Sequence, residues 1–528
     1  MDQFYIYIAA FLLALLCLLP HFTSPALEPE EPPLVLPKIP LIGHIIEIIR
    51  DGRQYYIKLC AKTQLPAFTI NMLHKKTYLI ASASLVPSIQ RSAKTISFDP
   101  FAAEVAERMA GISGDGLKLY LDPEKGGAGM GEKLLRVMHS VLLGGDLEGL
   151  ASLAARGIQT GLDDLRLSQS LDLLAWCRHT IGLATTDAVY GPMNPYKKKE
   201  FEDAIHLSER ERKRTYDSGL DTLSLNIFPA LVARKAYKAR EKLSKRFSEY
   251  FEKEEYAHAS PLVQERFKVQ YESGATYEDI GKLESSMAIA LLGNTVPSTF
   301  WVVFDILSRP DLLHKIREEV AQNALQVSPT SDTKTTCIIN MNDIRDNCPL
   351  LLAALQETLR LRASVASIRL VTKDTKLNDT YLLKANTLVQ TPSNVLNRDP
   401  QIWGSDAHLY NPARFLETHI TPTVGEKKRD QKRYSFMSFG TSPWTCPGRH
   451  LVCAEVLALV AMLIMRFDVV PVSGTWTSPR INHRSLALSI APPAEGLMVN
   501  IIPRKEAERV EWGFKVMEGK SKFGLLVG

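Results

Sequence analysis

The 528-residue chain is predicted to fold as a mainly α-helical protein with small β-sheets. In residues 310–320, apolar side chains recur on one helical face after an initial proline, which is typical of a helix start. Residues 283–307 are predicted to form a long buried helix. Three short runs favour strands, and they span residues 68–70, 77–80 and 388–391. Helical patterns therefore dominate.

Composition narrows the functional class. Apolar residues make up 45% of the chain, which is enough to bury a large core, and the formal charge is only +5. Length alone would suggest two to four domains, although single enzyme folds of this size exist. We find no basic stripe interleaved with aromatic residues, so the sequence gives no indication of nucleic-acid binding.

The cysteine pattern argues against a disulfide framework and against a structural zinc site. The seven cysteines are odd in number, scattered and without a Cys-x-x-Cys pair. A reducing compartment with mostly inert, buried thiols is therefore expected. The seven are Cys17, Cys60, Cys177, Cys337, Cys348, Cys446 and Cys453.

The N-terminus resembles a membrane anchor. Residues 4–19 are uninterruptedly apolar and nearly long enough to span a bilayer as a helix. A cleaved signal peptide or a buried core helix would be the alternatives. The chain starts Met-Asp-Gln, without the basic region that a signal peptide needs. We therefore assign residues 1–24 to an uncleaved anchor.

A proline-rich stretch follows the predicted anchor. Six prolines within residues 25–40 predict a stiff, extended hinge, because proline fixes φ and blocks helix continuation. Residues 41–528 are predicted to form one globular domain. Within it, the charged stretch 200–254 is interpreted as helical with a solvated face, and the polar stretch 326–336 as a surface loop.

The most informative stretch is the loop FMSFGTSPWTCPGR, residues 436–449. Its glycines and prolines predict a loop, and an apolar helix follows from Leu451 to about Met465. Cys446 therefore lies just before a helix N-terminus, where unpaired N–H groups favour a thiolate, a strong iron ligand. The alternative is an ordinary loop thiol. Cys453 is interpreted as a core residue of the helix.

This loop resembles the haem-binding loop of the cytochrome P-450 superfamily, Phe-Gly-x-Gly-x-x-x-Cys-x-Gly. Four residues fall at matching positions: Phe439, Gly440, Cys446 and Gly448. Ser442 replaces the second glycine of the pattern. Trp444 stands where many members carry a basic residue that reaches a haem propionate. The resemblance implies the cytochrome P-450 fold and a haem (iron protoporphyrin IX) with an axial thiolate.

The resemblance also implies roles for individual residues. Cys446 would be the metal ligand, and Phe439, Trp444 and Arg369 would contact the cofactor. The segment LQETLRLRAS carries Glu357 and Arg360 three apart on one helical face, and Asn397–Phe415 resembles the superfamily's meander. Glu357, Arg360 and Arg414 would then form a buried structural triad.

The charge pair and Arg369 each have a plainer alternative. The carboxylate and guanidinium in LQETLRLRAS could form an ordinary surface ion pair, which is worth a few tenths of a kcal/mol. Arg369 could be a solvated strand residue.

The long helix lacks the acid-threonine pair that the superfamily uses for oxygen protonation. It carries Gly293-Asn294-Thr295 instead, and Pro297 frees the Gly293 carbonyl. This pattern looks like the branch of sterol 7α- and 12α-hydroxylases and prostacyclin synthase. Asn294 and Thr295 are the catalytic candidates, since Asn294 could orient dioxygen or water. Alternatively, both side chains merely satisfy the backbone at the kink.

The resemblance implies a monooxygenase that inserts one oxygen atom into a lipophilic molecule, with electrons from NADPH through a cytochrome P-450 reductase. The divergent N-terminal half resembles fungal enzymes of secondary metabolism, so a terpenoid, steroid-like or polyketide substrate is expected. The anchor implies a single-pass protein of the endoplasmic reticulum with a cytosolic body. Residues implied to face the substrate are Ala288, Ile289, Leu292, Val365 and Ala366.

Two other functions remain open at this stage. A haem-thiolate isomerase or dehydratase would act without a reductase, and the missing acid favours it. A haem sensor would need neither a substrate cavity nor an anchor. A basic cluster before the cysteine loop could receive an acidic reductase surface, or could simply be solvated. The cluster comprises Lys427, Lys428, Arg429, Lys432 and Arg433.

Overall fold

A computed structural model describes most of the chain outside the N-terminus. The described residues are 27–39, 42–72, 75–121, 129–165, 169–197, 223, 229–331, 334–364, 366–416, 425–483, 485–507, 510–515, 519 and 522–526. The predicted anchor, residues 1–24, lies outside them. So does most of the first half of the charged stretch 200–254.

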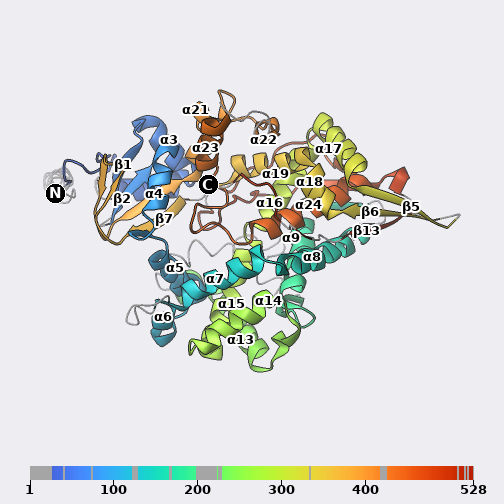
Figure 1. Ribbon diagram of the computed structural model, residues 1–528, viewed down its shortest axis with the longest axis horizontal. Coiled ribbons are helices and arrows are strands. Elements are labelled where there is room, and N and C mark those ends of the chain that lie inside the picture. Colours follow the sequence, from blue (N-terminus) through green and yellow to red (C-terminus); the bar gives the residue numbers. More distant parts are fainter. Residues whose placement is uncertain are drawn as a thin grey trace, which may run out of the picture.

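The protein is mainly helical with small sheets, as predicted (Figure 1). The helices before the long central pair are α2 (Gly43–Asp51), α3 (Gln54–Thr63), α4 (Val86–Arg91), α5 (Asp99–Val105), α6 (Gly114–Leu121), α7 (Met130–Leu143), α8 (Asp146–Asp163), α9 (Leu173–Tyr190), α12 (Pro229–Val232), α13 (Arg234–Glu252) and α14 (Pro261–Glu272). The central pair and the later helices are α15 (Tyr277–Leu292), α16 (Thr295–Leu307), α17 (Pro310–Asn323), α18 (Met341–Asn347), α19 (Pro349–Arg362), α20 (Ser393–Leu396), α21 (Pro400–Trp403), α22 (Ala413–Leu416), α23 (Gly425–Ser435) and α24 (Arg449–Arg466). Short 3₁₀ or π turns span Ala83–Leu85, Ala106–Ala110, Pro195–Lys197, Glu255–His258 and Lys505–Ala507.

The strands form four small sheets. The largest has the order β1-β2-β10-β7-β3, in which only the β2–β10 pairing is parallel. The others have the orders β11-β12-β4, β13-β6-β5 and β8-β9. The strands are β1 (Ala67–Met72), β2 (Lys75–Ile80), β3 (Ile96–Ser97), β4 (Gln169–Asp172), β5 (Leu325–Ser331), β6 (Lys334–Asn340), β7 (Ala366–Val371), β8 (Thr375–Leu377), β9 (Tyr381–Leu383), β10 (Leu388–Pro392), β11 (Phe467–Pro471), β12 (Met498–Pro503) and β13 (Val510–Lys515).

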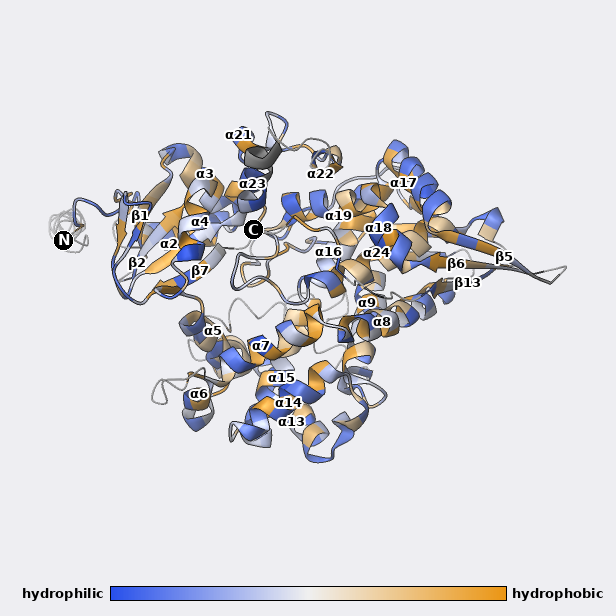
Figure 2. Cartoon of the chain, viewed as in Figure 1, coloured by the Kyte–Doolittle hydropathy of each residue, from blue (hydrophilic) through white to orange (hydrophobic). Residues whose placement is uncertain are grey.

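Two apolar helices form the centre of the core. Every residue of α16 is buried, and so are all but three residues of α24. A helix that is apolar on all sides must be surrounded by protein, because no face of it tolerates water. Helix α16 packs against α9, α19 and α24. Figure 2 shows orange residues gathered on these inner elements, whereas outer helices such as α17 mix blue and orange.

Most sequence-based elements are confirmed. The strand-like runs lie in β1, β2 and β10, which are neighbours or next neighbours in one sheet. The pattern in residues 310–320 lies in α17, and the helix predicted after the cysteine loop is α24. The described part of the charged stretch contains α13, whose apolar side chains pack toward α15.

The long helix predicted over residues 283–307 is not one unbroken helix, and the interruption lies where Pro297 predicts a kink. The structure breaks it at Gly293 and Asn294, between α15 and α16. Pro297 has no N–H to donate to the Gly293 carbonyl, so the helical ladder is interrupted there. The side chain of Asn294 also bonds outside the helix, as described below. The two helices still run end to end.

The predicted surface loop over residues 326–336 is also wrong, because most of it belongs to the β5–β6 hairpin. β6 pairs in parallel with β13, so the strand is stabilised by a segment near the C-terminus. On β6, Cys337 and Ile339 alternate inward and are buried. A polar window read alone cannot reveal a distant partner strand.

Part of the predicted hinge, residues 25–40, is docked on the main sheet. Glu31 is buried and forms an ion pair with Lys76 at 2.8 Å. The Val35 N–H donates to a carbonyl of β1 at 2.8 Å. The globular body therefore starts before the predicted boundary at residue 41.

Candidate functional site

Cys446 lies just before α24, whose N-cap is Gly448. The Cys446 N–H donates to the Phe439 carbonyl at 2.8 Å and closes the loop. Burial raises the pKa of the Cys446 thiol, while hydrogen bonds from the N–H groups of Gly448 and Arg449 and the Arg449 charge act to lower it. A positively charged metal added to such a site would deprotonate the thiol outright. The features of the loop that favour a thiolate are therefore the N–H groups at the start of α24 and the charge of Arg449.

Accessibility separates Cys446 from the other cysteines. Of the six cysteines in the described part of the chain, it is the only one that is not buried. Cys453, seven residues after Cys446, is completely buried in α24, and burial raises the pKa of its thiol strongly. Among these six thiols, only Cys446 can reach a ligand without opening the core.

The shape of the loop depends on Gly440. This residue has φ +80°, and its N–H donates to the Met437 carbonyl at 3.0 Å. A Cβ at this position would lie 3.1 Å from the carbonyl oxygen of Trp444. Residues other than glycine rarely adopt this φ. Phe439 is half-buried and packs against the main core, which fixes the start of the turn.

Arg369 lies on β7 and is buried against the same loop. Its Nη2 donates to the Thr441 hydroxyl, and its guanidinium stacks over the Trp444 ring at 4.8 Å. Burial lowers the pKa of Arg369 to about 10. Its Nη1 is buried and has no hydrogen-bond acceptor among the described residues. An unpaired buried donor of this kind is costly unless an anionic group is bound.

Trp444 makes a different contact from the one that the sequence suggested. Its indole N–H donates to the Asp99 carboxylate at 3.2 Å, and its ring lies near that of Phe98. The N–H is therefore directed at α5 in this structure. Trp444 contacts the buried guanidinium of Arg369 through its ring face, which orients that arginine.

Glu357 is the centre of a buried charge cluster. Both Glu357 and Arg360 have fully buried side chains, joined by two hydrogen bonds of 2.7 and 2.8 Å. Arg414 approaches Glu357 to 3.4 Å, an ion-pair distance without hydrogen-bond geometry, and bonds Asp406 at 2.6 Å. The Asn411 N–H also donates to Glu357 at 2.8 Å.

This cluster is linked to the cysteine loop through Asn397. Arg360 Nη1 donates to the Asn397 carbonyl at 2.6 Å. The Asn397 side-chain oxygen accepts from the Met437 N–H at 3.2 Å. Met437 in turn begins the turn that ends at Gly440. Continuous hydrogen bonding thus connects the charge cluster to the loop that carries the thiol.

Asn294 uses its side-chain oxygen to bind a distant segment. Oδ1 accepts from the N–H groups of Ser489 at 2.7 Å and Ile490 at 3.0 Å. Since both partners are donors, the atom that faces them must be the oxygen. The amide nitrogen has no acceptor within the described residues. Thr295 is buried, and its hydroxyl donates to the Leu291 carbonyl at 2.6 Å.

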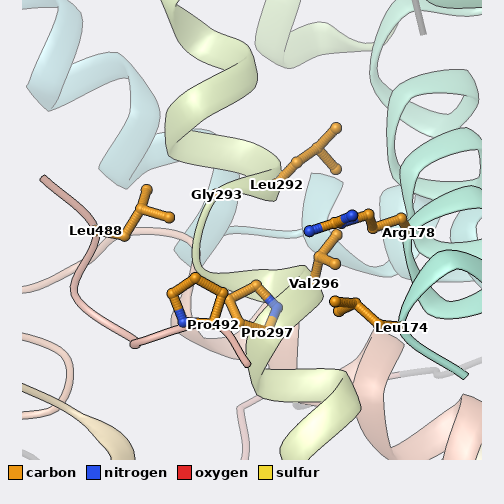
Figure 3. A pocket seen from close by; sticks show the side chains of 8 residues that line it. All are labelled: Leu174, Arg178, Leu292, Gly293, Val296, Pro297, Leu488 and Pro492. Carbon is orange, nitrogen blue, oxygen red and sulfur yellow. The ribbon is translucent and has the colours of Figure 1, made fainter. Parts of the chain in front are cut away.

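A small pocket lies beside the break between α15 and α16 (Figure 3). Of the residues predicted to face the substrate, Leu292 lines this pocket, Ala288 is buried one turn earlier, and Ile289 packs near Leu488. Val365 and the side chain of Ala366 lie outside the described parts. The lining residues are Leu174, Arg178, Leu292, Gly293, Val296, Pro297, Leu488 and Pro492.

Comparison with known proteins decides the family. A family model described as "Cytochrome P450" matches residues 184–498. The cytochrome P450 monooxygenase nodJ of Hypoxylon pulicicidum is 40% identical over 506 residues, which cover 95% of this chain and 96% of that relative. This chain belongs to the cytochrome P450 family.

Other relatives agree with the predicted branch. A cytochrome P450 monooxygenase of Gibberella zeae is 25% identical over 515 residues, covering 95% of this chain and 94% of the relative. The cholesterol 7-alpha-monooxygenase of Cricetulus griseus is 23% identical over 487 residues, covering 88% and 92%. The predicted superfamily, with fungal and sterol 7α-hydroxylase-like relatives, is therefore confirmed, and this P450 is a monooxygenase of haem-thiolate type.

The residues present fit a haem. The cofactor needs a thiolate ligand and donors for its carboxylates. The partly exposed Cys446 offers the first, and the unpaired buried Nη1 of Arg369 offers a donor for the second.

Sequence reasoning missed a buried acid in this P450. Glu455 lies on α24, accepts from the Thr185 hydroxyl at 2.7 Å, and its Oε2 has no partner among the described residues. Burial raises its pKa to about 8. A polar residue within an apolar run, at LVCAEVLAL, was the available signal.

Glu455→Gln is expected to change how stability depends on pH. Unfolded glutamate titrates near 4.3, whereas folded Glu455 keeps its proton to about pH 8. Between these pH values the unfolded state binds fewer protons than the folded state. The free energy of unfolding of the parent therefore falls by about 1.4 kcal/mol per pH unit as pH rises. Glutamine removes this loss and should stabilise the protein by about 3 kcal/mol at pH 7.

The measurement is thermal unfolding of parent and variant from pH 5 to pH 8. The difference between the two melting temperatures should grow with pH. Other titrating groups act on both proteins, so they cancel in the difference. A difference that stays constant over this range would contradict the raised pKa.

Proposed function

We propose that this cytochrome P450 inserts one oxygen atom from O₂ into a lipophilic small molecule, with Cys446 as the axial ligand and NADPH as the electron source through a reductase. The observation that carries the proposal is the partly exposed Cys446 thiol just before α24, in the same loop that Arg369, with its unpaired buried donor, contacts through Thr441 and Trp444. When bound, the haem supplies oxygen activation, which no protein side chain provides.

The chain's own residues bind, orient and exclude water. Leu292, Val296 and Leu488 give the pocket by the helix break an apolar lining, which suits a lipophilic substrate. Arg369 neutralises an anionic group of the cofactor, and Phe439 fixes the cysteine loop. Because Asn294 Oδ1 is already bonded, this side chain can only donate to a reacting oxygen or a water, through its amide nitrogen.

The proposed substrate is a terpenoid, steroid-like or polyketide metabolite of a fungus. The support is similarity to fungal P450 monooxygenases and, more distantly, to cholesterol 7-alpha-monooxygenase, which acts on a sterol. The position of attack depends on pocket shape.

A haem-thiolate isomerase is the second candidate, and one observation favours it. Neither Asn294 nor Thr295 is an acid, and the Thr295 hydroxyl is bonded to a backbone carbonyl. An isomerase needs no external proton for oxygen cleavage. The monooxygenase is preferred because named monooxygenases cover nearly the whole chain.

The two candidates differ in oxygen incorporation. We expect the purified enzyme to form product only when NADPH, reductase and dioxygen are all present. When the dioxygen is isotopically labelled, we expect one labelled oxygen atom in each product molecule. Mass spectrometry of the product checks this. A control without reductase should give no product. Unlabelled product in that control would instead establish the isomerase.

The proposed reductase contact is the basic cluster before the cysteine loop. In the described part of this cluster, Lys432 donates to the Arg414 carbonyl at 3.1 Å and Arg433 is exposed. The side chains of residues 427–429 lie outside the description. An acidic reductase surface would complement this charge and speed association at low salt.

We further propose that residues 1–24 anchor the protein in the endoplasmic reticulum, with the body in the cytosol. Within the described residues, Tyr277–Leu307 is the stretch long and apolar enough to cross a membrane, and it is mostly buried in the core. Support for membrane contact comes from exposed aliphatic side chains within the proposed hinge, directly after it and on α2. They are Leu36, Ile39, Ile42, Ile46 and Ile49.

Protease treatment of sealed microsomes tests this topology. The body should be digested without detergent, because it faces the outside of the vesicle. A lumenal protein in the same vesicles should stay intact and serves as the control. A protected body would contradict the orientation, and a body released by carbonate washing would contradict the anchor.

A further inference from the structure

We propose that Asn294 is a positioning residue: its side-chain oxygen holds the segment 485–493 against the break between α15 and α16, and so fixes the shape of the adjoining pocket. The inference rests on the proposed haem site at Cys446, because the pocket is assigned to ligands of that site. It assigns to Asn294 a role in ligand selection that is separate from any action on oxygen.

The contact is two-pronged and bridges distant parts of the chain. Asn294 Oδ1 accepts from two successive N–H groups, those of Ser489 at 2.7 Å and Ile490 at 3.0 Å. A single acceptor between adjacent amides fixes both the position and the direction of the backbone. No hydroxyl side chain at this position would reach both amides with the same geometry, because serine and threonine are one bond shorter.

The segment depends on such contacts, because it contains only isolated bridges to other parts of the chain. Its carbonyls are bonded elsewhere: Ser489 accepts from the Ser364 N–H at 2.9 Å, and Ala491 accepts from the Trp301 indole at 2.8 Å. Arg53 donates to the Leu488 and Ser489 carbonyls. Asn294 supplies the acceptor for the two neighbouring N–H groups.

The held segment forms one wall of the pocket. Figure 3 shows Leu488 and Pro492 facing the helix break, with residues of α9 on the other side. The approach is close, because a Cβ on Gly293 would lie 2.8 Å from Leu488 Cδ2. A small shift of the segment therefore changes the wall directly. The Asn294 side chain is the group at the helix break that hydrogen-bonds to this wall.

The test uses the haem-loaded, full-length protein and two iron-binding azoles. Imidazole is small and needs only the iron, whereas clotrimazole is bulky and would also reach a pocket that serves the haem site. The dissociation constant of each follows from its Soret shift. Asn294→Ala should weaken clotrimazole about tenfold, as expected for two lost hydrogen bonds, with imidazole unchanged.

Two further variants separate the possible roles. Asn294→Asp keeps an oxygen that accepts both N–H groups but loses the amide donor, so clotrimazole should bind about as in the parent. Ser298→Ala is the matched control, since the Ser298 hydroxyl donates only to the Asn294 carbonyl within the same helix. If the alanine variant loads haem poorly, Asn294→Leu keeps the side-chain size without an acceptor.

The outcomes distinguish this inference from the proposed function. Equal clotrimazole binding by Asn294→Ala, or Asn294→Leu, and the parent would overturn the positioning role. Equal weakening of both azoles by the alanine and aspartate variants would also overturn it, because Asn294 would then act at the iron. A haem-free parent, with no imidazole shift, would overturn the haem site itself.

Discussion

Cys446→Ala is expected to abolish the red-shifted Soret band that the reduced enzyme gives with carbon monoxide. This band reports a thiolate bound to the haem iron, and alanine offers no ligand atom. The loop geometry favours this cysteine as the proposed ligand: it is partly exposed, it precedes α24, and the N–H groups of Gly448 and Arg449 point to its sulfur. The measurement is the difference spectrum, normalised to haem content.

A matched variant controls for general damage to α24. Cys453→Ala removes a sulfur of the same size, but Cys453 is completely buried, so the band should persist with a modest loss of stability. Cys446→His offers a different ligand and should retain haem without the thiolate band. Loss of the band in Cys453→Ala, with retention in Cys446→Ala, would show that the ligand was assigned to the wrong cysteine.

The sequence predicted those features that depend on local patterns. Most residues of helix α24 are apolar, so its burial follows largely from composition. The turn requires a positive φ at residue 440, and the glycine at that position indicates such a turn in the sequence. The break at Gly293 was foreseen as a kink, because proline removes a known hydrogen bond.

Features that depend on distant partners could not be predicted in this way. The Asn294 oxygen is bonded to Ser489 and Ile490, almost two hundred residues later in the sequence. The Trp444 indole donates to Asp99, which lies in another part of the chain. Side chains of these types have several possible partners, and only the folded backbone selects one. The resemblance supplied the cysteine loop but not these contacts.

Arg360→Ala is expected to leave little haem-loaded protein. The Arg360 and Glu357 side chains are both completely buried, so removal of the arginine leaves an uncompensated carboxylate in the core. Breaking a buried pair on one side costs roughly 3–5 kcal/mol, a large share of the roughly 5–15 kcal/mol that stabilises a typical protein. The carbonyls of Asn397 and Ala407 would also lose their donor. The measurement is the ratio of haem to protein after purification.

The burial of the Glu357–Arg360 pair, and not its three-residue spacing, is expected to cause the loss of haem loading. A second charge pair in the chain provides the control. Asp115 and Lys118 in α6 have the same three-residue separation, but both side chains are exposed. Lys118→Ala should therefore load haem normally, because exposed pairs contribute little. Arg360→Lys keeps a charge but loses the planar fork that reaches Glu357 and two carbonyls, so its loading should fall between parent and alanine.

The same variants separate a structural role from a catalytic one. Asn397 connects Arg360 to Met437, so loss of the arginine should loosen the cysteine loop before any chemistry occurs. The small fraction of Arg360→Ala that retains haem should then show near-parent turnover per haem. A variant that loads haem fully but turns over no substrate would contradict this, because the charge cluster would then act on the reaction and not on the fold.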